Sequence, residues 1–413
     1  MKRLILIIPL LITLLSLRAQ EDKKLSEKLT YNVHGFIKSD FWHDSRKLAT
    51  SREGIFALYP LDQDLDANGN DINAVHNFNY SIVTSRIGVT IKGFKALGAD
   101  ISTELEADFA GITTATTGVF RIRQAHIKID WKKDQLIIGQ TWHPLFVPDV
   151  APSVISLNTG APFQPFNRSP QIRYTRTQGN LKIIAAVISQ RDFVSIGPIG
   201  RSYTYLSNSN SPNLHIQLKY KKNKTTVGIA ADYKTLRPRL VSNNNIVDDN
   251  IVNGVSYMAY YKWQGEKFIV RAKATWAQNL SDQLVLGGYA VASIDTITDI
   301  RTYTPTQHLL TYVDFDYIIK TEKLTFLPGF FLGYAKNFGT LEKNESIYHS
   351  AGSNIDNVYR LGPNFSIKAG RLMFSLEYEY TVANYGTADS FGIISNTHAV
   401  SNNRLLFTTF FFF

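Results

Sequence analysis

The sequence predicts an all-β protein, a transmembrane antiparallel up-and-down β-barrel of about 16 strands with short periplasmic turns and long extracellular loops. Three observations support this prediction. Polar and apolar residues alternate with a period of two from residue 31 to the end, the connections between alternating segments are in turn short and long, and an aromatic residue stands at the last position. Mean hydropathy is −0.12, and the one long apolar run, residues 4–17, is too short for a spanning helix of about 20 residues.

The alternation is clear in residues 99–109, where the odd positions carry Ala, Ile, Thr, Leu, Ala and Phe and the even positions carry Asp, Ser, Glu, Glu and Asp. Residues 214–221, 255–263 and 371–382 behave in the same way. Successive side chains of a strand point to opposite faces, so each of these segments has one apolar and one polar face.

A soluble, exported β-sandwich would also alternate, and it is the main alternative fold. The segments here run about 9–13 residues, longer than the usual soluble strand and suited to a tilted membrane crossing. Tryptophans at 131, 263 and 276 and a phenylalanine at 365 lie near segment ends, as in an aromatic girdle. These features favour the barrel.

The predicted strands are residues 31–43, 78–93, 98–110, 119–131, 135–142, 171–178, 181–191, 213–220, 225–237, 254–263, 268–278, 306–320, 324–336, 356–369, 371–385 and 401–413.

The first 20 residues have the order of a secretory signal peptide. Lys2 and Arg3 precede the apolar residues 4–17, and the small residue Ala19 follows. We expect residues 1–19 to be removed, with cleavage after Gln20 as the close alternative. A membrane anchor is the less favoured interpretation, since Pro9 interrupts a run already too short to span. Residues 20–30 then form a short periplasmic N-terminal segment, and residues 31–413 form the barrel.

Composition excludes several classes of function. The chain has no Cys, so disulfides, thiol catalysis and thiolate metal sites are absent. The formal net charge of +10 comes from cations spread along the chain and not from a basic stripe or arm, so no nucleic-acid partner is expected.

The last strand carries a further signal. Leu405, Phe407, Phe411 and Phe413 share one face, and an aromatic residue ends the chain. This pattern resembles the C-terminal signal that the barrel assembly machinery of bacterial outer membranes recognises, with Phe407, Phe411 and Phe413 as its residues. A frayed tail is the alternative, but so apolar a tail would promote aggregation.

Five motifs in residues 84–174 give a more specific resemblance. They are TSRIGV at 84–89, LEADF at 105–109, FRIRQAHI at 120–127, IIGQTW at 137–142 and SPQIRY at 169–174. Their order resembles the DcaP-like porins and, more distantly, the phosphate-selective porins. The resemblance implies a sixteen-stranded homotrimer in a Gram-negative outer membrane that passes small anions such as dicarboxylates. Some members carry an N-terminal coiled coil, and here only residues 21–30 precede the first strand.

Residues 143–170 form the connection best suited to narrow a pore. They hold six of the 14 prolines together with many apolar residues, which suggests a stiff, packed loop. We expect it to fold into the lumen as a constriction loop, with Pro144, Phe146, Pro148, Pro162 and Phe166 as its main residues. Lying over the centre of a trimer is the alternative.

The phase of the strands places charges of both signs in the lumen. The pore-lining or solute-contacting candidates are Arg86, Arg121, Arg123, Lys128, Arg173, Arg271, Glu104, Glu106 and Asp108. Guanidinium groups bind carboxylates in a bidentate manner, so we expect an anion path with Arg123 and Arg173 as principal contacts. Mutual neutralisation of Arg86 and Arg123 by Glu104 and Glu106 is the alternative.

The first long connection contains part of a calcium-loop pattern. Asp64, Asp66, Asn68 and Asn70 match its ligand positions 1, 3, 5 and 7, but Val75 occupies position 12, where a bidentate Glu is needed. A weak calcium site is the expectation here, an ordinary solvated loop is the alternative, and no other cofactor is expected.

Taken together, the sequence predicts an outer-membrane porin, a passive channel for small hydrophilic solutes that favours small organic anions. Its expected partners are outer-membrane lipid and lipopolysaccharide, the assembly machinery, anionic solutes and further copies of itself. An adhesin or partner-binding scaffold is one alternative function. A hydrolase on the barrel wall is another, although the chain has no G-x-S-x-G or H-E-x-x-H motif and therefore no expected catalytic role.

Overall fold

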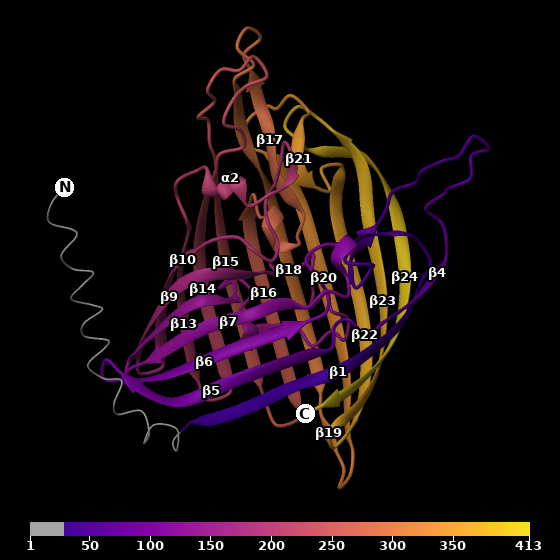
Figure 1. Ribbon diagram of the computed structural model, residues 1–413. Helices are drawn as coiled ribbons and strands as arrows, with labels where there is room; N and C mark the ends of the chain where they lie inside the picture. Colours follow the sequence, from indigo (N-terminus) through magenta and orange to yellow (C-terminus); the bar gives the residue numbers. More distant parts are fainter. Residues whose placement is uncertain (1–28) are drawn as a thin grey trace, which may run out of the picture.

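The computed structural model describes residues 29–413, so the predicted signal peptide and residues 20–28 lie outside the described part. The described chain forms a closed antiparallel barrel of 16 strands, and the predicted fold class is confirmed. The barrel closes where β1 (Thr30–Asp44) pairs with β24 (Ile394–Phe412), from Phe36 opposite Phe412 to Asp44 opposite Arg404 (Figure 1). No helix within residues 29–413 is long and apolar enough to cross a bilayer.

The remaining wall strands are β4 (Asn77–Ser81) continued by β5 (Arg86–Ala96), β6 (Ala99–Asp108), β7 (Arg121–Asp130), β8 (Asp134–Trp142), β9 (Arg168–Gln178), β10 (Leu181–Ile188), β13 (Asn213–Lys222), β14 (Thr225–Leu236), β15 (Val252–Gln264), β16 (Phe268–Gln278), β18 (Arg301–Tyr317) with β19 (Ile319–Lys320), β20 (Thr325–Thr340), β22 (Ile355–Ala369) and β23 (Leu372–Ala388). The long connections carry β2 (Leu48–Ser51), β3 (Phe56–Pro60), β11 (Ile196–Gly197), β12 (Gly200–Arg201), β17 (Gly287–Ile294), β21 (Tyr348–Ala351), α2 (Thr204–Ser207) and the short 3-10 turns η2 (Thr114–Thr116), η3 (Pro148–Val150) and η4 (Ser281–Gln283).

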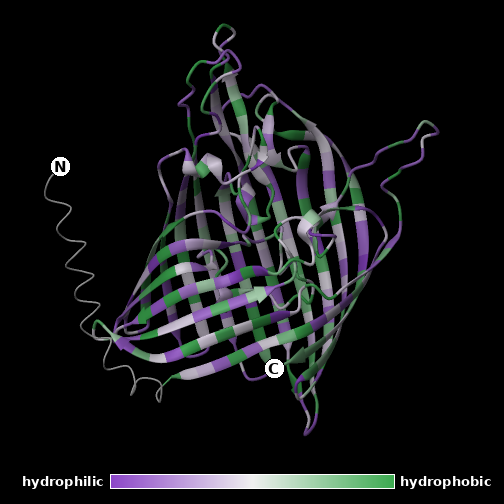
Figure 2. Ribbon diagram, viewed as in Figure 1, coloured by the Kyte–Doolittle hydropathy of each residue, from purple (hydrophilic) through white to green (hydrophobic). Residues whose placement is uncertain are grey.

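The period-two pattern sorts side chains to the two faces of the wall, and Figure 2 shows the alternation along the strands. In β24, Leu405, Phe407 and Phe411 point outward and are 42–49% exposed, while Arg404 and Thr408 point inward and are at most 2% exposed. An outward apolar band meets lipid tails, and the inward face meets the lumen and its contents.

Several strands extend further than the sequence predicted. β18 begins at Arg301 and β24 at Ile394, whereas the alternation had indicated residues 306 and 401. β17 and β21 also pair with each other inside connections predicted to be loops. The added residues of β18 and β24, RTYTP at 301–305 and ISNTHAV at 394–400, do not alternate regularly between polar and apolar side chains, so the sequence carries no strand pattern there.

The last residue takes part in closing the barrel. Gly35 and Phe413 exchange two backbone hydrogen bonds of 3.1 Å. A Cβ atom at Gly35 would lie 2.1 Å from the carbonyl oxygen of Arg86 and 2.9 Å from the Phe413 ring, so only glycine permits this approach.

We expect deletion of Phe410–Phe413 to prevent assembly, because it removes the pairing of Phe36, Ile37 and Lys38 with β24 together with two outward aromatic rings. The measurement is the amount of heat-modifiable protein in the outer membrane. Phe411→Leu keeps an apolar outward side chain and serves as the control. Normal levels of heat-modifiable protein from the deleted chain would contradict the prediction.

Candidate functional site

The connection between β8 and β9 lies inside the barrel wall. β8 ends at Trp142 and β9 begins at Arg168, so the loop comprises residues 143–167, called the inner loop below, and residues 168–170 of the predicted loop belong to β9. All of its residues from Gly160 to Asn167 are buried. Inward-facing side chains of the wall surround the loop and hold it in place.

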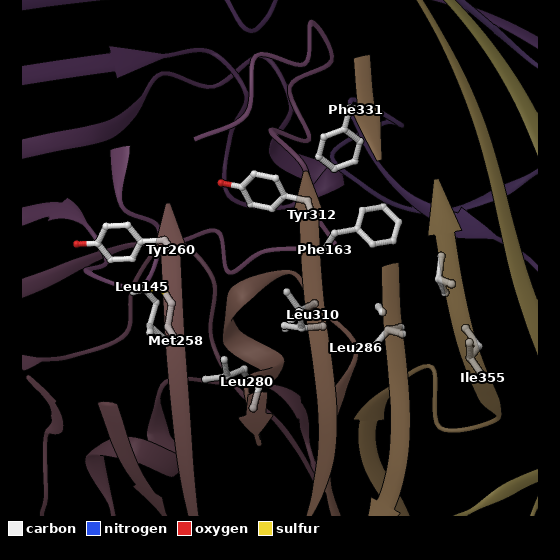
Figure 3. Close-up of a cluster of buried hydrophobic side chains, with 14 of the residues drawn as sticks. Leu145, Phe163, Met258, Tyr260, Leu280, Leu286, Leu310, Tyr312, Phe331 and Ile355 are labelled. Atoms are coloured by element: carbon white, nitrogen blue, oxygen red, sulfur yellow. The ribbon is translucent and has the colours of Figure 1, made fainter. Parts of the chain in front are cut away.

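Apolar side chains fix the two ends of the inner loop. Leu145 and Phe163 belong to one buried cluster with Tyr260 of β15, Tyr312 of β18 and Phe331 of β20 (Figure 3). The ring centroids of Phe163 and Phe331 lie 5.9 Å apart. Since these wall residues share the inward face, the loop crosses the lumen to reach them.

The predicted constriction residues all lie in this loop. Phe146 stacks on Trp142 with a centroid distance of 4.0 Å, and Phe166 packs edge-on against Trp142 at 5.2 Å. Pro144 and Pro162 are buried, and Pro148 is exposed at the start of η3.

Carboxylates of β23 bind the middle of the inner loop. The buried side chain of Glu377 accepts the backbone N–H groups of Ile155 at 2.7 Å and Ser156 at 2.9 Å. Glu379, two residues further on the same face, accepts the side-chain amide of Asn158 at 2.8 Å. These three hydrogen bonds fix the middle of the inner loop against β23.

A second carboxylate pair lies on β18. The backbone N–H of Ser153 donates to Asp314 at 3.2 Å, and the Ser153 hydroxyl donates to Asp316. Arg271 of β16 binds both carboxylates, at 2.5 and 2.6 Å. The predicted lumen residue Arg271 is therefore neutralised where it stands.

Wall cations bind carbonyl groups of the same loop. Lys38 donates to the carbonyl of Ile155 at 3.0 Å, and Lys273 donates to that of Phe146 at 3.0 Å. Arg360 donates to the carbonyl of Ala161 at 3.2 Å. Backbone groups that water would otherwise satisfy are thus satisfied by the barrel wall.

We expect replacement of residues 152–163 by a short Gly-Ser linker to raise single-channel conductance, because the segment occupies space enclosed by the wall. Heat-modifiability serves to check that the barrel still assembles. Replacement of the projecting residues 63–70 by the same linker is the control and should leave conductance as it was. If conductance of the shortened chain equals that of the full chain, the inner loop does not limit the pore.

The arginines of the motif region are paired with carboxylates. Arg123 is 1% exposed and donates to Glu106 at 2.7 Å and to Asp108 at 2.9 Å. Arg121 donates to Asp108 at 2.6 Å, and Arg86 lies 3.6 Å from Glu106. Carboxylates therefore neutralise Arg86 and Arg123, which was the alternative to an open anion path. Asp108 takes the place expected for Glu104.

Glu104 stands apart from these pairs, and its carboxylate accepts the side-chain amide of Gln124 at 3.3 Å. Lys128 pairs with Asp130 at 2.9 Å. Arg173 is partly exposed, and within residues 29–413 no carboxylate oxygen lies within 4.0 Å of its guanidinium. Of the predicted lumen cations, Arg173 is therefore the one without a carboxylate partner in residues 29–413.

Three further charged residues form a cluster that sequence reasoning missed. Asp192 accepts Arg52 and Arg121 at 2.7 Å each and also binds Arg168, and all four side chains are at most 4% exposed. We call Asp192, Arg52, Arg121 and Arg168 the Asp192 cluster. Arg52 and Asp192 lie in irregular connections, where no periodicity marks an inward position, so the sequence held no signal for their pairing.

The Asp192 cluster ties together separate parts of the chain. Arg52 belongs to the β2–β3 turn, Arg168 is the first residue of β9, and Asp192 belongs to the connection after β10. Burial opposes ionisation of Asp192, but the three guanidinium groups outweigh it and hold the pKa of this carboxyl well below its usual range.

We expect Asp192→Asn to loosen the loops around the cluster, because three buried guanidinium groups lose their shared countercharge. Breaking a buried ion pair costs about 3–5 kcal/mol. Hydrogen exchange should show the free energy of local opening of residues 45–60 falling by this order. Asp295→Asn, at an exposed carboxylate with only local hydrogen bonds, is the control. Unchanged protection in the Asp192 variant would rule out this role.

The pH dependence follows from the same pKa. The folded-state pKa of Asp192 lies below its unfolded value of about 3.9. Its contribution to the stability of the surrounding loops is therefore complete above pH about 4 and is lost as the pH falls through the folded-state pKa. Loop protection in the native protein should therefore persist to pH about 4 and fail only in stronger acid.

The calcium-like segment forms a polar hairpin tip that projects away from the barrel (Figure 1). The carboxylate of Asp66 accepts the backbone N–H groups of Asn68 and Asn70, both at 2.8 Å, and these bonds lower the pKa of Asp66. Asp64 donates its N–H to Asp71 at 3.2 Å. No group of three or more acidic or histidine side chains in residues 29–413 is arranged to hold a metal ion, and calcium binding here stays a prediction.

Comparison with known proteins agrees with this architecture. The crystal structure of the outer membrane channel DcaP of Acinetobacter baumannii superposes with a TM-score of 0.67 at 16% identity, over 94% of this chain and 98% of that chain. OmpT of Vibrio cholerae gives 0.54 at 8% identity, over 94% and 98%. An anion-selective porin from Comamonas acidovorans gives 0.53 at 8% identity, over 93% and 100%. No curated protein matches significantly.

At these identities the structural likeness establishes the barrel architecture alone. The family assignment comes from the sequence, since the family described as DcaP outer membrane protein matches residues 20–268, more than half of the chain. The resemblance found in the motifs is thereby confirmed. The chain belongs to the DcaP outer membrane protein family and is an outer-membrane channel of the porin fold.

Proposed function

We propose that this protein is a passive diffusion channel that favours small organic anions such as dicarboxylates. The observation that carries the proposal is the set of charges left open in the lumen after the inner loop has bound its partners. Cations remain accessible on one side of the wall, while the main carboxylates of the opposite side are occupied.

The occupied carboxylates are those of β18 and β23. Asp314, Asp316, Glu377 and Glu379 are at most 8% exposed and all bind the inner loop. A carboxylate that is buried and bonded presents little free negative charge to a passing ion, and its field is further reduced by the cations next to it.

The open cations lie on the inward faces of β9, β10, β13 and β15. We call them the basic wall, which comprises Arg173, Lys182, Lys221 and Lys262. Register supports the inward placement, since Lys182 stands opposite Lys219 and Arg173 opposite the buried Ala186. Accessible cations along a polar lumen attract anions and repel cations.

Arg173, and not Arg123, is the contact that we propose for the solute. Arg123 is enclosed by Glu106 and Asp108, whereas the guanidinium of Arg173 is open and can present a fork to a carboxylate. One structural relative is the anion-selective porin of Comamonas acidovorans, so an anion preference is compatible with this fold.

We also propose a homotrimer in contact with outer-membrane lipid and lipopolysaccharide, built by the barrel assembly machinery. The outward band of Leu, Ile, Val and aromatic side chains supports the lipid contact. One structural relative, Vibrio cholerae OmpT, is described in a trimer form, which supports the trimer.

A passive channel rather than a hydrolase is the proposal, and the histidine contacts support it. His215 binds Asp232 at 3.1 Å and Gln217 at 3.3 Å, and His398 binds Asp62 at 2.6 Å. Throughout the described chain no serine hydroxyl is hydrogen-bonded to a histidine ring, which is the contact that a serine nucleophile requires.

We expect Arg173→Ala to shift the reversal potential across a salt gradient toward cation selectivity and to slow uptake of succinate, while a neutral sugar passes as before. Salt of about 0.1 M keeps screening to about 10 Å, so the charge of one side chain is still felt in the lumen. Arg176 lies on the outward face of the same strand, paired with Asp134 at 2.6 Å, so Arg176→Ala is the matched control. A native channel that already prefers cations would overturn the proposal.

A further inference from the structure

A polar pocket lies at the periplasmic ends of β13, β14 and β15. It has a volume of about 360 Å³, and its lining includes Lys221, Lys224, Lys262, Asp149 and Glu266. Lys221 and Lys262 belong to the basic wall, Lys224 and Glu266 belong to the two turns at the rim, and Asp149 comes from the inner loop.

Asp149 is held in this pocket by the packing of its own neighbours. Val147 and Val150 are at most 5% exposed within the main buried cluster, and the hydroxyl of Tyr312 donates to the carbonyl of Val150 at 2.5 Å. The short turn η3 therefore leaves Asp149 facing away from the cluster, with its side chain 49% exposed.

Three lysines lie around the carboxylate of Asp149. It forms an ion pair with Lys219 and lies near Lys221 and Lys262. Burial of Asp149 opposes its ionisation, but the hydrogen bond and charge of Lys219 and the charges of the other lysines lower its pKa overall.

The pocket keeps an excess of positive charge even with Asp149 in place. Four lysines, at 219, 221, 224 and 262, face two carboxylates, Asp149 and Glu266. Within residues 29–413 no carboxylate oxygen lies within 4.0 Å of the amino groups of Lys221, Lys224 or Lys262. A bound anion reduces the electrostatic repulsion between these lysines.

We propose that this lysine pocket is a binding station for a small dianion on its way to the periplasm, and that Asp149 is a tethered competitor for it. The inner loop thereby supplies a carboxylate in the position that a carboxylate of the solute would take. The inference rests on the proposed anion path and adds to it a site and an internal regulator.

The tether sets the strength of the competition. Because its neighbours Val147 and Val150 are packed, the carboxylate of Asp149 stays beside the lysines at a high effective concentration and weakens solute binding. It does not abolish binding, since Lys221, Lys224 and Lys262 have no ion-pair partner within residues 29–413. The station is then occupied by solute only when solute is abundant, and release toward the periplasm is fast because Asp149 returns to the lysines.

The test measures equilibrium binding of succinate to the purified, folded full-length protein by calorimetry. Asp149→Asn should tighten binding at least about threefold, because the internal competitor is lost. Asp130→Asn removes one negative charge at a carboxylate that pairs with Lys128, outside the pocket, and is the matched control expected to leave the affinity unchanged. Lys221→Gln with Lys262→Gln should abolish the binding that Asp149→Asn strengthens.

If the Asp149 and Asp130 variants bind succinate with equal affinity, Asp149 is not a competitor. If the variant that lacks both lysines binds succinate as well as the native protein does, the lysine pocket is not the binding site. Heat-modifiability of every variant shows that the barrel is assembled. Reversal potentials keep this test separate from the proposed function. An anion-selective channel without the affinity change refutes the station alone, and a cation-selective channel refutes the anion path whatever succinate does.

Discussion

The hydrogen bonds between the inner loop and four carboxylates of the wall determine most of what this barrel can do. Glu377 and Glu379 on β23, with Asp314 and Asp316 on β18, accept N–H and hydroxyl groups from residues 153–158. A loop inside a barrel gives up water as a partner, and each backbone group left without a substitute would cost free energy. Carboxylates spaced two residues apart along a strand supply acceptors on one face at the spacing that such a loop needs.

These contacts also decide which charges a solute meets. A lumen with rows of both signs would have little net preference, but the carboxylates of β18 and β23 are buried under the loop that they bind. Of the cations on β9, β10, β13 and β15, Lys219 pairs with Asp149 of the loop. Within residues 29–413, Arg173, Lys182, Lys221 and Lys262 have no carboxylate oxygen within 4.0 Å. The anion preference that we propose rests on this division, in which one sign is used for structure and the other remains free, and not on the overall composition of the chain.

The arginines of the sequence motifs are also among the charges used for structure. Arg121 and Arg123 resemble solute-binding arginines, yet their guanidinium groups bind Asp108, Asp192 and Glu106. Through Asp192, the first long connection and the connection after β10 are joined to the wall. Arg360 strengthens the arrangement, since it donates to the carbonyls of both Ala161 in the inner loop and Leu58 in β3. The first connection is therefore partly packed within the barrel mouth, a role that its polar sequence did not reveal.

The barrel wall could be derived from the sequence alone. A period of two distinguishes lipid-facing from lumen-facing positions residue by residue, so the strand count, the inward placement of Arg173, Glu377 and Asp314, and the outward placement of Phe411 all follow from local alternation. The proline-rich composition of residues 143–170 likewise indicates a stiff, packed loop. The pairing of the inward charges, in contrast, became visible only in the folded protein. Arg52, Arg168 and Asp192 meet across long stretches of irregular chain, and Asp149 reaches Lys219 across the lumen, because such pairings depend on where loops fold in three dimensions and leave no periodic trace in the sequence.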